Sequence, residues 1–370
     1  MYGMPKNIVW LESTFIFYLA IIITCFIIAL VFERVVIKIG DIRFRNLDIC
    51  LVSIILIFVK GFLYCGRDLI NGYYNNFISA TSFGQIRDDS LEIGYKFLNV
   101  IINNIFHEYW VFVLIIAIIT ILPIMIFIGK YRDQLSVPYA VLFYVSIYFF
   151  PSFSVLRIYL ASSIGILVFV CLLKKRAFLA FLGIIFASLF HTSMLFLFIP
   201  YFLLEFKFLS RKTIVCILVS IFAIVYIERH SLAALFTGRY EGYNSFEMAT
   251  IGIQQFVYYL PLIGLFFYVK KYITEPWDQR VFFSYLSVGF TFGLLGYVIS
   301  IFGRSQAVFL PIVFIVAYLV KIMEENDCLY NRIIKLALII YCIMRFWIYI
   351  SEYYNIDDIM PYVNFFGWSI

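Results

Sequence analysis

The sequence predicts an all-α polytopic membrane protein, and three observations lead to this fold class. Of the 370 residues, 64% are hydrophobic and only 14% are charged, whereas soluble domains average about 45–50% apolar and about 25% charged residues. The mean hydropathy is +0.98. The apolar residues also form unbroken blocks such as 15–32 and 110–128, unlike the alternating strands of a membrane β-barrel. This composition excludes a soluble globular enzyme and a disordered chain.

Twelve apolar segments are candidates for transmembrane helices, since a helix needs about 20 apolar residues to cross the hydrocarbon. Three of them, 137–150, 177–191 and 193–206, are short, and we expect these to be tilted, broken or re-entrant. No internal repeat or linker divides the chain, so residues 1–370 are expected to form a single domain. The twelve segments are 14–32, 47–65, 109–128, 137–150, 155–173, 177–191, 193–206, 213–228, 252–270, 280–301, 305–322 and 333–350.

Basic residues orient these segments. Alternate loops hold 18 of the 28 Lys and Arg residues, including the triplet Lys174, Lys175 and Arg176. By the positive-inside rule these loops face the cytoplasm, and this use of the basic residues gives no reason to expect nucleic acid as a partner. An even number of spans then places both termini on the outer side, together with two long loops, 66–108 and 229–251.

Ionisable side chains near the predicted outer ends of spans are candidates for a functional site. A charge there costs about 2.5–3.5 kcal/mol on insertion scales and therefore suggests a function, with snorkelling or interhelical pairing as the alternative. Arg157, Arg304 and His191 share one depth, which favours a site, whereas for Arg345 within the last span both interpretations stay open. Guanidinium groups bind phosphate bidentately, and histidine exchanges protons near neutral pH.

The outer loop 66–108 adds carboxylates and tyrosines. Asp68 is suited to orient or deprotonate a sugar hydroxyl, although a pair with Arg67 or a loop turn explains it equally well. Glu92 is a second acidic candidate, with a helix cap as the alternative. The outer tyrosines suit sugar-ring stacking or an interfacial aromatic belt; they include Tyr73, Tyr74 and Tyr95.

Several absent motifs narrow the chemistry. The sequence has no Walker loop, no G-x-G-x-x-G, no G-x-S-x-G and no histidine cluster with metal spacing. No D-x-D stands in a predicted cytoplasmic loop to hold a metal and a nucleotide sugar. We therefore expect no metal, no cofactor and no nucleotide donor. A lipid pyrophosphate is a good leaving group without a metal if arginines neutralise its developing charge.

Six short motifs follow one another along the chain. They are Gly66-Arg67-Asp68…Tyr74, Glu92-Ile93-Gly94-Tyr95…Asn99, Leu156-Arg157…Leu160-Ala161-Ser162, Ser188-Leu189-Phe190-His191-Thr192-Ser193, Arg304…Pro311 and Met360-Pro361-Tyr362. In this order they resemble the EpsG family, Wzy-type polymerases of bacterial surface polysaccharides. The resemblance spans residues 60–365, and Arg157 with Phe190-His191 is its most specific part. The family commonly has a small residue between the first Gly and Asp, where this chain has Arg67.

The resemblance implies a fold, an activity and partners. It implies a membrane glycosyltransferase similar to the GT-C class in the bacterial inner membrane. Such an enzyme transfers a growing glycan from undecaprenyl pyrophosphate to a lipid-linked repeat unit at the outer face, without a metal. Its partners would be the lipid-linked donor and acceptor oligosaccharides and membrane lipid, with a chain-length regulator as a further candidate.

Residue roles follow from the motifs and the resemblance together. Arg157 and Arg304 are expected to bind the pyrophosphate and stabilise it as it leaves. His191 is expected to assist at that phosphate or to act as the base on the acceptor hydroxyl. Asp68 and Glu92 are expected to position the acceptor sugar. The remaining candidate binding residues are Tyr95, Arg345 and Tyr74.

Three other classes of protein stay open at this stage. A flippase for lipid-linked oligosaccharides would share arginines for pyrophosphate, but it should show charges along a central cavity and similar halves. A membrane O-acyltransferase usually takes a cytoplasmic donor, so its histidine and arginines should reach inward. An O-antigen ligase shares the chemistry of a polymerase and differs in its acceptor, which the sequence does not resolve.

Overall fold

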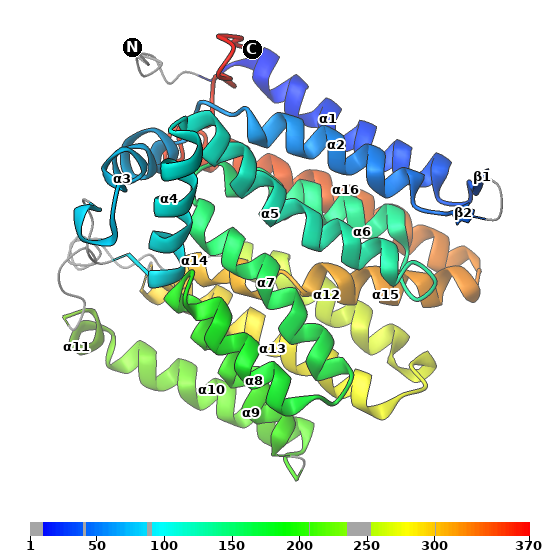
Figure 1. Ribbon diagram of the computed structural model, residues 1–370. Coiled ribbons are helices and arrows are strands. Elements are labelled where there is room, and N and C mark those ends of the chain that lie inside the picture. Colours follow the sequence, from blue (N-terminus) through cyan, green and yellow to red (C-terminus); the bar gives the residue numbers. More distant parts are fainter. Residues whose placement is uncertain (1–9, 40–41, 87–90, 207, 235–252, 300) are drawn as a thin grey trace.

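The chain folds into a bundle of helices, most of which run roughly side by side (Figure 1). The structure is a computed structural model that describes residues 10–39, 42–86, 91–206, 208–234, 253–299 and 301–370. Within these ranges, 6 helices are long and apolar enough to cross a membrane, so the chain is a polytopic membrane protein. They are α1 (Glu12–Phe32), α5 (Tyr109–Lys130), α7 (Leu156–Leu173), α13 (Pro276–Val298), α15 (Ile312–Glu325) with its preceding turn η8 (Ser305–Phe309), and α16 (Leu329–Tyr353).

Shorter apolar helices occupy the other six predicted segments. The three segments expected to be short are confirmed as such. They are α6 (Val137–Tyr144) with the π-helical turn η3 (Val145–Phe149), α8 (Ala177–Ser188), and the 3-10 turn η5 (Thr192–Leu197) with α9 (Phe198–Glu205). The remaining helices are α2 (Leu47–Gly61), α10 (Arg211–Ile227) and α12 (Ile253–Val269).

The predicted outer loop 66–108 is itself largely helical. It contains the π-helical turn η1 (Leu69–Tyr73), α3 (Tyr74–Ser79), the turn η2 (Phe83–Gln85) and α4 (Ile93–Phe106). Figure 1 shows α3 and α4 at the same end of the bundle as α11 (Arg229–Ala233) and α14 (Ile301–Arg304). We call this end the predicted outer end. Most of the other predicted outer loop, 229–251, lies outside the described residues.

The opposite end of the bundle carries a short two-stranded sheet. Strands β1 (Ile37–Ile39) and β2 (Ile42–Phe44) form a short antiparallel hairpin between α1 and α2. Arg132 follows α5 nearby and lies 3.1 Å from the buried carboxylate of Asp48, with only 6% of its side chain exposed. It also donates to the backbone carbonyls of Glu33 and Arg45. Arg132 therefore holds this loop to the bundle in addition to carrying an orienting charge.

The C-terminal tail packs back against the first two helices. The Tyr18 hydroxyl donates to the carbonyl of Ile359 at 2.6 Å, and the Tyr362 hydroxyl donates to the carbonyl of Val59 at 3.0 Å. Tyr362 is buried, with 3% of its surface exposed. The contacts of the Pro361-Tyr362 motif thus anchor the tail between α1 and α2.

Candidate functional site

Two of the predicted motifs meet Arg157 at the first turn of α7. Arg157 Nη1 lies 2.5 Å from Glu92 Oε2, and the two side chains are only 17% and 5% exposed. The other oxygen of Glu92 accepts from the backbone nitrogen and the hydroxyl of Thr192, each at 3.3 Å. Glu92 therefore connects the arginine to the Phe190-His191-Thr192 motif.

Gly94 explains why the acidic motif needs glycine at its third position. Its backbone nitrogen donates to the carbonyl of Leu189 at 2.8 Å. A Cβ at Gly94 would lie 2.8 Å from that carbonyl oxygen and 3.2 Å from the Phe190 ring. Only glycine allows the first turn of α4 to approach the end of α8 this closely, and this approach brings Glu92 to Arg157.

Gly94→Ala is expected to lower the thermal unfolding midpoint of the purified protein. Alanine favours a helix over glycine by about 1 kcal/mol, but the clash is with backbone and forces a shift that typically costs about 1–3 kcal/mol. Gly84→Ala is the matched control, because no atom lies within 4 Å of its added Cβ. Equal midpoints for the two variants would contradict this account of the motif.

Two tyrosine rings enclose the Arg157 guanidinium. Its central carbon lies 5.9 Å from the Tyr73 ring centroid and 5.7 Å from that of Tyr95. Tyr95 is fully buried, and Arg157 Nε is buried without a hydrogen-bond partner among the described residues. Tyr74, the other predicted tyrosine, instead packs edge-on against Tyr109 at 5.1 Å. The ring that contacts Arg157 from this segment is therefore Tyr73.

Asp68 belongs to the same electrostatic cluster. Arg67 forms its ion pair with Asp358, at 3.3 Å. The pKa of the Tyr73 hydroxyl is raised, chiefly by burial. The Arg157 guanidinium lowers this pKa, and the Asp68 carboxylate raises it. Asp68 is half-buried at the start of η1, so its charge acts on the tyrosine that contacts Arg157.

His191 begins η5 in the same motif as Thr192. Its Nδ1 accepts a hydrogen bond from the backbone nitrogen of Ser193 at 3.2 Å. A neutral imidazole whose Nδ1 accepts carries its proton on Nε2. The half-buried ring is therefore prepared to donate a hydrogen bond through Nε2.

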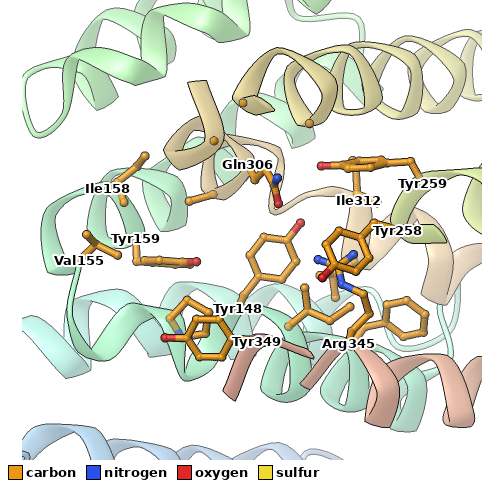
Figure 2. A pocket seen from close by; sticks show the side chains of 18 of the residues that line it. Tyr148, Val155, Ile158, Tyr159, Tyr258, Tyr259, Gln306, Ile312, Arg345 and Tyr349 are labelled. Atoms are coloured by element: carbon orange, nitrogen blue, oxygen red, sulfur yellow. The ribbon is translucent and has the colours of Figure 1, made fainter. Parts of the chain in front are cut away.

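A cavity of about 570 Å³ lies on the opposite side of the first turn of α7 (Figure 2). Val155, Ile158 and Tyr159 line it. Val155 precedes α7, and Ile158 and Tyr159 share one face of the helix. At about 100° per residue, Arg157 falls on the opposite face. Arg157 and the cavity are thus separated by the turn of helix to which both belong.

Arg345 is the arginine that lines this cavity. Its guanidinium carbon lies 3.5 Å from the Tyr258 ring centroid, and Nη1 donates to the Tyr341 hydroxyl at 3.1 Å. Gly303 also lines the cavity, and a Cβ on Gly296 would lie 2.7 Å from the Gly303 Cα. Arg304 follows Gly303 at the end of α14, but its side chain lies outside what the structure describes. Arg157 and Arg345 therefore have different surroundings: Arg157 is paired with Glu92, and Arg345 lines the cavity.

Sequence reasoning did not select two acidic residues of the cavity wall, Glu352 and Asp357. For Glu352 a signal was present: Tyr341, Arg345, Tyr349 and Glu352 recur at helical spacing in the last span and share one face. Asp357 lies in the segment after α16, where no periodicity indicates the direction of a side chain.

The fold and the site together define a polytopic membrane protein in which three of the predicted motifs meet around Arg157. The chain belongs to the EpsG family, whose model matches residues 46–364, and the resemblance predicted over 60–365 is confirmed. This family is associated with polysaccharide polymerases, a glycosyltransferase-type activity, and its members are typically bacterial membrane proteins. No curated protein and no solved structure matches the chain.

Proposed function

We propose that the protein polymerises a bacterial surface polysaccharide at the outer face of the inner membrane. It transfers a growing glycan from undecaprenyl pyrophosphate to a lipid-linked repeat unit, without a metal, in a fold of twelve membrane crossings similar to the GT-C class. The observation that carries this proposal is the meeting of the Glu92, Arg157 and His191-Thr192 motifs, next to a cavity at the predicted outer end.

The contacts of each residue suggest its role. Arg157, with Arg304, stabilises the pyrophosphate as it leaves, since guanidinium groups neutralise developing phosphate charge. Glu92 holds Arg157 in place, which makes it a positioning residue. His191 donates to a phosphate oxygen through Nε2, and Asp68 orients the acceptor sugar.

Two separate cationic positions favour a polymerase over a flippase. A polymerase must hold two lipid-linked substrates at once, whereas a flippase moves one. Arg157 and Arg345 lie on opposite sides of the first turn of α7, which suits two substrates that meet there. The position of His191 at the predicted outer end is also unlike that expected for an acyltransferase with a cytoplasmic donor.

The proposal is tested by deleting the gene and complementing the deletion strain with the His191→Ala variant. We expect the deletion strain to display single-repeat glycans, and His191→Ala to restore few or no long chains. His230→Ala is the matched control, an exposed histidine in α11, and should restore full-length ladders. A deletion strain without any surface glycan would indicate a flippase instead, and full ladders with His191→Ala at normal expression would exclude its role.

A further inference from the structure

One arginine, Arg345, lines the cavity. Within the described part of the chain, Arg345 forms no ion pair, and its contacts are the Tyr258 ring and the Tyr341 ring and hydroxyl. It lies about 12 Å, or eight residues, below the end of α16. Arg157, by contrast, is paired with Glu92. A charge at this depth without an ion pair is energetically costly, and an anionic ligand would offset that cost.

The same face of α16 carries a polar stripe along the cavity. Tyr341, Arg345, Tyr349 and Glu352 all line it, and their spacing of three and four residues puts them on one side of the helix. From Arg345 to Glu352 the stripe runs about 10 Å along the axis. Positive charge therefore lies deep in the span and negative charge lies toward its end.

Asp357 completes the stripe at the rim of the cavity. Its Oδ2 accepts from the Tyr349 hydroxyl at 2.7 Å, and its carbonyl accepts from the backbone nitrogen of Arg67 at 2.8 Å. The bond from Tyr349 orients this carboxylate, a group with about four acceptor positions. The Tyr148 and Tyr159 rings supply flat apolar surface in the same cavity (Figure 2).

We propose that this cavity is a saccharide-binding site that takes an anionic group at Arg345 and a sugar hydroxyl at Asp357. The proposal rests on the proposed function and names the chemistry of one of its two substrate sites. The anion is either the pyrophosphate of a lipid-linked glycan or the carboxylate of an acidic sugar. The polarity of the stripe suits a lipid-linked sugar, which presents its phosphate on the membrane side and its hydroxyls outward.

Binding to the purified full-length protein in nanodiscs tests the site, with inorganic pyrophosphate, glucuronic acid and glucose as probes. Pyrophosphate is followed by ³¹P line broadening and the sugars by saturation-transfer NMR. Arg345→Gln should raise the Kd of the anionic probes about tenfold or more. Asp357→Asn should weaken both sugars and leave pyrophosphate within about twofold, because it removes a carboxylate acceptor but no cation.

Arg332→Gln is the matched control, an exposed arginine at the other end of α16 paired with Asp327, and all three probes should bind it as they bind the wild type. Arg345→Lys keeps the charge and serves if the glutamine variant does not fold; it should retain pyrophosphate binding with a modestly raised Kd. Pyrophosphate binding alone points to the lipid carrier, and glucuronic acid binding without glucose binding points to an acidic sugar.

The proposed site is contradicted if Arg345→Gln binds the anionic probes as tightly as the wild type does. It is also contradicted if Arg332→Gln loses as much binding as Arg345→Gln. These results are independent of the glycan profile in cells. If the purified protein shows Arg345-dependent binding but the deletion strain does not show the polymerase phenotype, the binding site is supported and the proposed function is contradicted. If complementation restores long chains but binding does not depend on Arg345, the binding site is contradicted and the proposed function is not.

Discussion

Arg157→Ala is expected to lower the free energy of unfolding by about 3–5 kcal/mol and to abolish long polysaccharide chains. Removing one partner of a buried ion pair leaves the other charge uncompensated, which is the source of that cost. Here the remaining charge is Glu92, whose side chain is 5% exposed. Its ion pair with Arg157 is lost, and its hydrogen bonds from Thr192 are kept. SDS-induced unfolding followed by circular dichroism measures the change, and glycan ladders measure function.

A double-mutant cycle separates structural from catalytic loss. Arg157→Ala combined with Glu92→Ala should recover part of the stability, because no buried charge remains, and should still give no long chains. Arg45→Ala is the matched control: its ion pair with Asp133 is 54% and 73% exposed, and such surface pairs are worth about 0–1 kcal/mol. Additive effects of the two alanine substitutions, or full ladders from the double variant, would contradict the roles given to this pair.

The sequence was sufficient for the helices because hydrophobic patterning alone determines them. Each predicted apolar segment contains helix among the described residues, and three of the six shorter ones were identified by length. The separation of Arg157 from the cavity that Arg345 lines was not predictable in the same way. Both lie near the predicted outer end, but which face of a helix a residue occupies relative to its neighbours depends on tertiary packing.

The choice between Tyr73 and Tyr74 shows the same limit at finer scale. The two residues are adjacent, so their side chains leave the helix about 100° apart. The π-helical turn η1 ends at Tyr73, and its altered winding determines which ring faces Arg157. Asp357 is a harder case, because its position depends on backbone hydrogen bonds to a segment about 290 residues earlier.

Gly66→Ala is the second variant with a large expected effect, since Gly66 connects three parts of the site. Its φ of +108° is one that residues with a side chain rarely adopt, and an added Cβ would lie 2.8 Å from the Phe153 carbonyl oxygen. Its backbone nitrogen donates to the carbonyl of Asp358 at 2.8 Å, beside the bond from Arg67 to Asp357. Strained backbone and overpacking each cost about 1–3 kcal/mol.

The expected result is therefore a loss of about 2–6 kcal/mol in unfolding free energy. Sugar binding in the cavity should also weaken, because the backbone that positions Asp357 must move. Gly72→Ala, in η1 with no atom within 4 Å of its Cβ, should leave both quantities unchanged. Arg67→Ala removes a half-exposed ion pair with Asp358 but keeps the backbone bonds, so it should cost at most about 1 kcal/mol. If Arg67→Ala weakens sugar binding as much as Gly66→Ala does, the side-chain pair rather than the backbone positions Asp357.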